Sequence, residues 1–277
     1  MTKRNCAVDL NTVTEIARPR RRAELPAWKE GDAWLAGGTW LFSEPQNHLT
    51  RLIDITDLSW PALEVTDRSL RIAATCRVAE LDSAAFPASW TAAPLFNQCC
   101  RAFLASFKVW NMATVGGNLC MALPAGPMIS LTAALDGSCT IWTPDGGERQ
   151  VSVVDFIQRP ERNGLARGEL LRHIDFPIAA LQRRTAFRQI SLSPLGRSAA
   201  LLIGTRVQDS GAFALTVTAS TPRPVQLSFD AIPSCDTLQQ EIERAITTYH
   251  NDAHGSPVWR RYMTLRLAEE IRSELNG

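Results

Sequence analysis

Two pairs of adjacent glycines constrain this 277-residue chain more than any other sequence feature. Gly37-Gly38 follows a short apolar run in the segment LAGGTWLF, and Gly116-Gly117 lies in the segment NMATVGGNL. Glycine at the end of a strand is entropically unfavourable, so such a pair indicates a turn with positive φ or a backbone that another group approaches closely. Both loops would present main-chain N–H groups, which together could bind one diphosphate. The alternative is that they are two unrelated structural turns.

The segments around these loops alternate between strand-like and helix-like patterns. Apolar residues that recur every three to four positions predict helices, and short apolar runs bounded by turn residues predict strands. The predicted helices cover residues 11–17, 78–81, 92–107 and 128–135, and the predicted strands cover 33–36, 51–55, 70–74, 139–142 and 149–153, the last two forming a hairpin. Gly137, just after the helix 128–135, would take the left-handed conformation that ends many helices.

From Glu169 onward the pattern changes to a succession of strand-like runs, followed by two helices at 237–249 and 257–275. Strands followed by helices indicate an α+β domain in which helices cover one face of an antiparallel sheet. We therefore predict an α+β protein with three parts. They are an N-terminal α/β subdomain over residues 1–56, a central α/β subdomain over 57–178 and a C-terminal α+β domain over 179–277.

Composition excludes several classes of partner. The formal net charge of +1 lacks the basic surplus of a nucleic-acid-binding surface. No apolar run is long enough to span a membrane. The seven cysteines show no C-x-x-C spacing, so no metal ligands are predicted. An odd number of cysteines without a signal peptide predicts reduced thiols in a cytoplasmic protein.

Sequence motifs narrow the chemistry further. The patterns G-x-G-x-x-G, G-x-x-x-x-G-K-[ST] and G-x-S-x-G are absent, which removes the standard Rossmann, P-loop and hydrolase interpretations. His173 lies in a strand-like run and is interpreted as a structural residue. His250 and His254 lie close together but have no evident third metal ligand. No catalytic residue and no metal site are therefore predicted in this chain.

Six segments, in this order and spacing, match a known pattern: AGGT (36–39), LIDI (52–55), LRIAATCRVAEL (70–81), ATVGGN (113–118), ELLRHIDFP (169–177) and SPVWRRYMTLRLAEEI (256–271). They resemble the FAD-binding medium subunit of molybdenum hydroxylases, the family of xanthine dehydrogenase and carbon monoxide dehydrogenase. The resemblance implies an FAD-binding fold of the vanillyl-alcohol-oxidase (PCMH-like) type, with FAD between the N-terminal and central subdomains. The glycines would then let the backbone reach phosphate oxygens where a Cβ would collide.

The resemblance also implies which residues contact the cofactor. The two glycine loops would cradle the diphosphate of FAD from opposite sides, and Leu104 would face the flavin ring. Arg188 stands where the family usually has a lysine, which keeps the charge but changes its geometry. The implied contacts are Leu35, Ala36, Gly37, Gly38, Thr39, Trp40, Leu41, Leu104, Thr114, Val115, Gly116, Gly117, Asn118, Leu171 and Arg188.

The chain departs from the family pattern at several positions. Trp40 stands where the family usually has an acidic or other polar residue, and Gly126-Pro127 where it has Ser-Asp. Trp110 and Leu192 each replace an arginine. Loss of an aspartate that hydrogen-bonds the cofactor would weaken binding by about 1–3 kcal/mol if its partner stays unpaired. Trp40 could compensate by stacking on an aromatic ring of the cofactor.

The function that the resemblance implies is electron transfer. A substrate would be oxidised at a molybdenum cofactor on a large subunit, and electrons would cross 2Fe-2S clusters on a small subunit. FAD on this chain would then pass them to NAD+ or another acceptor. Two alternatives stay open: a structural or assembly subunit that has kept the fold but lost tight FAD binding, and a freestanding flavoprotein oxidase. Bound flavin in the purified chain would argue against the structural or assembly subunit.

Overall fold

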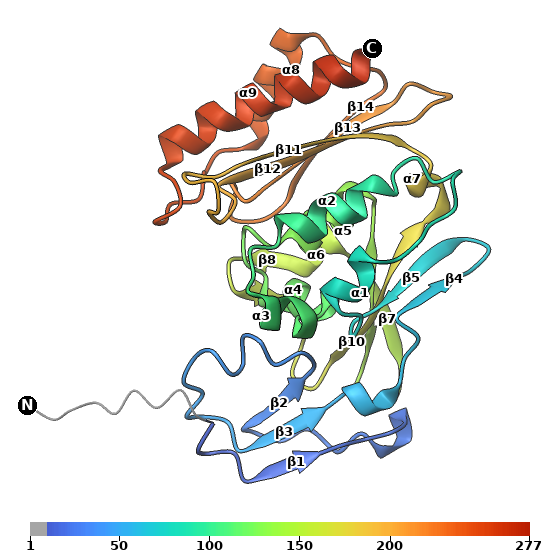
Figure 1. Ribbon diagram of the computed structural model, residues 1–277, viewed down its shortest axis with the longest axis vertical. Helices are drawn as coiled ribbons and strands as arrows, with labels where there is room; N and C mark the ends of the chain where they lie inside the picture. The colour runs from blue at the N-terminus through green and yellow to red at the C-terminus, as the bar shows by residue number, and fades with distance from the viewer. Residues whose placement is uncertain (1–9) are drawn as a thin grey trace, which may run out of the picture.

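A computed structural model describes residues 10–277 of the chain. Three principal β-sheets follow one another along the long axis of the molecule (Figure 1). The N-terminal strands lie at one end, the central sheet and most of the helices lie in the middle, and the C-terminal sheet with the last two helices lies at the other end. No helix within residues 10–277 combines the length and the apolar character needed to cross a lipid bilayer.

The N-terminal sheet is parallel, with the strand order β1-β3-β2. Its elements are β1 (Glu15–Ala17), β2 (Asp32–Leu35) and β3 (Arg51–Asp54), with two short 3-10 helices, η1 (Arg22–Glu24) and η2 (Thr56–Leu58). A buried ion pair connects two of the strands, with Arg51 Nη2 lying 2.6 Å from Asp32 Oδ2. Removal of Arg51 would leave the buried carboxylate of Asp32 without its cation, which is strongly destabilising, whereas Arg51 also lies 3.4 Å from Glu15.

The prediction of a helix over residues 11–17 is wrong. Residues 15–17 form β1, which pairs in parallel with β3 so that Ile16 lies opposite Leu52. Val13, Thr14 and Ile16 are all β-branched. Such residues lose side-chain freedom in a helix and pack well on a sheet, so the local propensity favours the strand that is observed.

The central sheet is antiparallel, with the order β4-β5-β10-β6-β7, and helices cover one of its faces. Its strands are β4 (Leu63–Val65), β5 (Ser69–Ala73), β6 (Ser138–Trp142), β7 (Glu148–Ser152) and β10 (Leu170–Pro177). The helices are α1 (Val78–Asp82), α2 (Pro94–Ala102), α3 (Phe107–Met112), α4 (Val115–Met121), α5 (Pro127–Ala134), α6 (Val153–Phe156) and α7 (Ile178–Leu181). A small hairpin joins β8 (Ile157–Arg159) to β9 (Arg162–Asn163).

Two local predictions in this part are wrong, whereas the predicted hairpin is confirmed as β6 and β7. The helix predicted over 92–107 is divided into α2 and α3. The backbone of Phe103 is extended, and Ser106 caps α3 by accepting a hydrogen bond from Val109 N. After α5 the left-handed residue is Asp136 (φ 52°), not Gly137. Position 137 needs glycine for a different reason: a Cβ there would lie 2.3 Å from the Thr132 side chain and overlap it.

The C-terminal sheet is antiparallel, as predicted, with the order β11-β12-β13-β14. Its strands are β11 (Arg184–Ile190), β12 (Ala200–Arg206), β13 (Phe213–Thr218) and β14 (Val225–Phe229). Helices α8 (Cys235–Ala245) and α9 (Pro257–Asn276) cover one face, while α2 and α5 contact the other (Figure 1). Each sheet draws its strands from one of the three predicted ranges, but the division into domains itself stays a prediction.

The face of the central sheet that lies opposite its helices carries a polar network centred on Asp175. The carboxylate of Asp175 accepts hydrogen bonds from Ser69, Arg71 and Thr140, and it lies 2.9 Å from His173 Nε2. Burial raises the pKa of Asp175, but the hydrogen bond and charge of His173 and the bonds from Thr140 and Arg71 outweigh it and lower the pKa to about 2. His173 thus contributes to the structure of the sheet.

This network predicts a loss of stability in acid. The pKa of Asp175 falls from an ordinary 3.8 to about 2 on folding, so its ionised form stabilises the protein above about pH 4. That contribution disappears as the pH falls from about 4 to about 2. At neutral pH we expect Asp175→Asn to lower the free energy of unfolding by about 2 kcal/mol. Urea denaturation of both proteins across this pH range measures the difference, and a difference that does not shrink in acid would contradict the prediction.

Candidate cofactor-binding cleft

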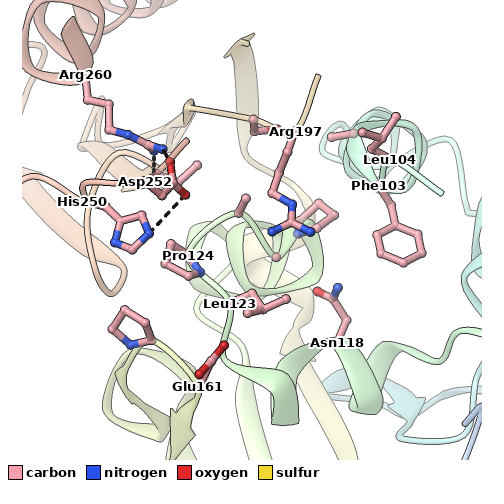
Figure 2. Close-up of a pocket in the computed structure, with 17 residues that line it drawn as sticks. Phe103, Leu104, Asn118, Leu123, Pro124, Glu161, Arg197, His250, Asp252 and Arg260 are labelled. Atoms are coloured by element: carbon pink, nitrogen blue, oxygen red, sulfur yellow. Dashed lines mark hydrogen bonds and ion pairs between the residues drawn. The ribbon is translucent and has the colours of Figure 1, made fainter. Parts of the chain in front are cut away.

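Two adjoining cavities form one cleft in the molecule. The N-terminal cavity, of about 340 Å³, lies between the loop 36–41 and helices α3 and α4. The C-terminal cavity, of about 270 Å³, lies between residues 123–127 and the loops that carry Arg197 and His250 (Figure 2). Both cavities are lined by Phe103, Leu104, Asn118, Leu123 and Arg197. Because the walls are shared, a single extended ligand can occupy both cavities.

The loop from Gly37 to Leu41 lines the N-terminal cavity and carries main-chain N–H groups for which the described part of the chain provides no acceptor. Within residues 10–277, none of the five N–H groups of this loop donates a hydrogen bond. The loop itself is held by a bond from Phe42 N to Gly38 O, 2.9 Å long, and Gly38 has a positive φ of 68°. The loop is half-buried. Half-buried N–H groups without acceptors, on a loop that lines a cavity, are suited to binding an anion.

Gly37 is needed because two segments of the protein approach each other closely. A Cβ on Gly37 would lie 1.9 Å from the carbonyl oxygen of Met112, at the end of α3. The same holds in the second pair, where a Cβ on Gly116 would lie 2.5 Å from the Cβ of Ala74. Both make room for neighbouring protein, and this packing positions the loops. That the glycines also let the backbone reach phosphate oxygens stays a prediction.

The second glycine pair lies in the first turn of helix α4, and its N–H groups already have acceptors. Gly116 N donates to Ala74 O at 3.0 Å, and Gly117 N donates to Thr114 Oγ1 at 3.1 Å. The prediction that this pair also forms an anion nest is therefore wrong. Two side-chain donors beside it, the Thr114 hydroxyl and the Asn118 Nδ2 group, have no acceptor among residues 10–277. The oxygens of both side chains accept hydrogen bonds, Thr114 Oγ1 from Gly117 N and Asn118 Oδ1 from Met128 N.

The structure brings ten of the predicted cofactor contacts together around the N-terminal cavity. They are Ala36, Gly37, Gly38, Thr39, Trp40, Leu41, Leu104, Thr114, Gly117 and Asn118. Trp40 is half-buried in the cavity wall, in a position that suits stacking on a ring of a ligand. These placements agree with a cofactor site, although the contacts themselves stay predictions.

The other five predicted contacts do not line either cavity. Val115, Gly116 and Leu171 are buried in the protein interior, and Leu35 ends β2 beneath the glycine loop. Arg188 lies on the face of the C-terminal sheet that α9 covers. There it pairs with Glu270 at 3.1 Å and Glu274 at 2.7 Å.

Other cavity residues lie outside any recognisable motif. Phe103, Met121 and Leu123 provide apolar walls, and Arg197 provides a cation. Sequence patterns did not indicate them because each depends on how two distant segments pack. Of the departures from the family pattern, Gly126-Pro127 lines the C-terminal cavity. Trp110 instead packs on the hydrophobic core, and Leu192 is 61% exposed.

A hydrogen-bonded cluster borders the C-terminal cavity. Arg260 is 1% exposed and donates to Asp252 Oδ1 at 2.5 Å (Figure 2). It also donates to the carbonyl of Ala199 at 2.6 Å. His250 Nε2 lies 3.3 Å from Asp252 Oδ2. Burial raises the pKa of Asp252, but the hydrogen bond from His254 N and the charge of Arg260 outweigh it, so the pKa is lowered. Within residues 10–277, no group of three or more His, Cys, Asp or Glu side chains is arranged to hold a metal ion.

The cysteine closest to the cleft is poorly suited to redox chemistry. Cys120 lines the N-terminal cavity, and burial raises the pKa of its thiol to about 12. Burial likewise raises the pKa of Cys100 to about 12 and that of Cys99 well above its ordinary value. These thiols stay protonated at neutral pH, and the thiolate is the reactive form.

The contact between Gly37 and Met112 predicts a clear effect of one methyl group. We expect Gly37→Ala to lower the free energy of unfolding by about 1–3 kcal/mol, because the new Cβ would overlap a main-chain carbonyl that no side-chain rotation can move. Gly164→Ala is the control, since the nearest atom to its new Cβ would be 3.5 Å away. Denaturation in urea measures both changes. Equal, small effects would show that the loop does not need this close approach.

Comparisons with known proteins identify the family. Residues 11–179 match the family model described as the FAD binding domain in molybdopterin dehydrogenase. The caffeine dehydrogenase subunit beta of a Pseudomonas species is 31% identical over 98 residues, which are 35% of this chain and 33% of that protein. The glyceraldehyde dehydrogenase medium chain of Sulfolobus acidocaldarius is 32% identical over 85 residues, which are 31% of this chain and 30% of that protein. The chain thus spans about a third of the length of these curated relatives.

Solved structures share the fold over nearly the whole chain. A reconstituted CO dehydrogenase from Oligotropha carboxidovorans has a TM-score of 0.81 at 20% identity, covering 93% of this chain and 95% of that chain. Quinoline 2-oxidoreductase from Pseudomonas putida 86 has a TM-score of 0.76 at 19% identity, covering 95% and 96%. These likenesses confirm the predicted α+β fold class. Because the family model matches more than half of the chain, the predicted cofactor FAD is confirmed, and the chain belongs to the family of FAD-binding domains of molybdopterin dehydrogenases.

Proposed function

We propose that this chain is the electron-transferring FAD subunit of a molybdenum-containing hydroxylase or dehydrogenase. It would take electrons from 2Fe-2S clusters on a small subunit and pass them to NAD+ or another acceptor, while a large subunit with a molybdenum cofactor oxidises the substrate. The observation that carries the proposal is the loop from Gly37 to Leu41, which lines a cleft of two cavities and whose N–H groups have no acceptor within residues 10–277. The names "subunit beta" and "medium chain" of the two relatives describe single chains of larger enzymes and support the proposed partners.

The donor set of the cleft fits a dinucleotide. FAD is an extended molecule in which a negatively charged diphosphate joins two ring systems, and the cleft has a row of N–H donors and two connected cavities. Thr39, Thr114 and Asn118 would add side-chain hydrogen bonds. Leu104 and Phe103 lie where the cavities meet and would pack against a ring and exclude water from it. Bound FAD supplies the redox chemistry, and the protein orients the ring and sets its surroundings.

One observation favours the alternative of a structural subunit with weak FAD affinity. The N–H groups of the second glycine pair are already bonded within the protein, so the diphosphate would have main-chain donors from only one of the two loops. In addition, Gly126-Pro127 provides no carboxylate where the family usually has an aspartate. Direct measurement of flavin affinity decides between the two readings.

Titration of the purified full chain with FAD, followed by quenching of flavin fluorescence, tests the proposal. We expect saturable binding, and we expect Thr39→Val to weaken it about three- to tenfold, because one hydrogen bond to the cofactor is lost. Thr185→Val is a matched control, since Thr185 is also half-buried but lies on β11 outside both cavities. No uptake of FAD by the wild-type chain would favour the structural alternative.

The electron-transfer part of the proposal needs the assembled enzyme. We expect a complex purified from the native host through a tag on this chain to contain molybdenum and iron by elemental analysis. We further expect anaerobic addition of NADH to bleach the visible absorption of the oxidised flavin. A complex with flavin but without these metals would contradict the proposed partners, and a flavin that NADH does not reduce would exclude NAD+ as the acceptor.

A further inference from the structure

Arg197 is the only charged residue among those described that line the N-terminal cavity. It lies on the loop between β11 and β12 and lines both cavities. In Figure 2 its guanidinium points into the cleft, on the side where Asn118 lies. Within residues 10–277, its side chain takes part in no ion pair and donates no hydrogen bond. A cation without a protein partner thus lines the N-terminal cavity, whose other lining residues are neutral.

The main chain beside Arg197 is firmly anchored, although the side chain is exposed. Ser198 is 2% exposed, and its hydroxyl accepts a hydrogen bond from Gln189 Nε2 at 2.9 Å. Ala199 N donates to Ile190 O at 2.8 Å, and Ala199 O accepts from Arg260 Nη1 at 2.6 Å. Because the main chain next to Arg197 is already fixed, binding of an anion costs less conformational entropy.

The acidic groups of the cleft do not neutralise Arg197. Asp252 is already paired with Arg260 at 2.5 Å and lies beside His250. Glu161 borders the C-terminal cavity, and it forms no ion pair with Arg197. The other donors around the N-terminal cavity are neutral N–H and side-chain groups. Hydrogen bonds from neutral donors alone would leave the two negative charges of a diphosphate uncompensated.

We propose that Arg197 is the counter-ion of the cofactor's diphosphate and holds it against the N–H groups of Gly37 to Leu41. This inference rests on the proposed function, because it requires the dinucleotide in the cleft. A guanidinium suits the task, since its planar fork of donors binds phosphate oxygens in pairs and its charge is permanent. Arg197 would then supply the main charge-dependent part of the affinity for FAD.

The affinities of Arg197→Met for FAD and for riboflavin test this inference. Riboflavin carries the flavin ring without the diphosphate. We expect Arg197→Met to weaken FAD binding about tenfold or more at low salt, with riboflavin binding unchanged. The loss should shrink at high salt, because the screening length falls from about 10 Å at 0.1 M to about 3 Å at 1 M. Arg197→Lys should bind FAD more tightly than Arg197→Met but less tightly than the wild type, since lysine keeps the charge but lacks the paired N–H donors of the guanidinium.

Arg223→Met is the matched control, because Arg223 is another exposed arginine on a loop of the C-terminal sheet but lines neither cavity. It should bind FAD like the wild type. If Arg197→Met binds FAD with wild-type affinity and salt dependence, the inference is overturned while the proposed function stands. Equal weakening of FAD and riboflavin would also overturn it, because Arg197 would then contact the flavin ring. A wild-type chain that binds no FAD would refute the proposed function itself.

Discussion

The contact between Gly37 and the carbonyl of Met112 joins the N-terminal sheet to the rest of the molecule. A side chain at position 37 would overlap that carbonyl, so the loop after β2 can reach its position only as glycine. The segment that receives it is fixed in turn by hydrogen bonds from Val78 N to Ala113 O and from Gly116 N to Ala74 O. Residues 112–118 therefore connect the glycine loop, helix α1 and the end of β5, and the walls of the cleft depend on all three.

The sequence allowed the fold class, the antiparallel C-terminal sheet, the β6–β7 hairpin and the glycine loop of the cleft to be predicted. It did not reveal that Gly116 and Gly117 would use their N–H groups within the protein, because a glycine pair looks the same whether its donors are free or bonded. The division of the helix 92–107 was missed for a similar reason. Apolar spacing continues through Ser106, whereas the extended backbone at Phe103 depends on packing.

Cavity residues without a motif were the hardest to predict. Phe103 and Arg197 come from segments almost a hundred residues apart, and only the packing of the C-terminal sheet against α2 and α5 brings both to the same cleft. Arg188 shows the opposite case. The resemblance implied that it contacts the cofactor, but residues of a strand point alternately to opposite faces, and its face is the one that α9 covers. Correspondence in sequence did not place its side chain at the cavities.

The order of strands in the central sheet has a consequence for synthesis of the chain. Strand β10 lies in the middle of the sheet, between β5 and β6, yet it is the last of the five strands in sequence. Until residue 177 has left the ribosome, β5 and β6 lack the neighbour that satisfies their inner edges. Such long-range pairing slows folding, and unpaired strand edges promote aggregation. The nascent chain therefore exposes two unpaired strand edges until β10 is available to pair with them.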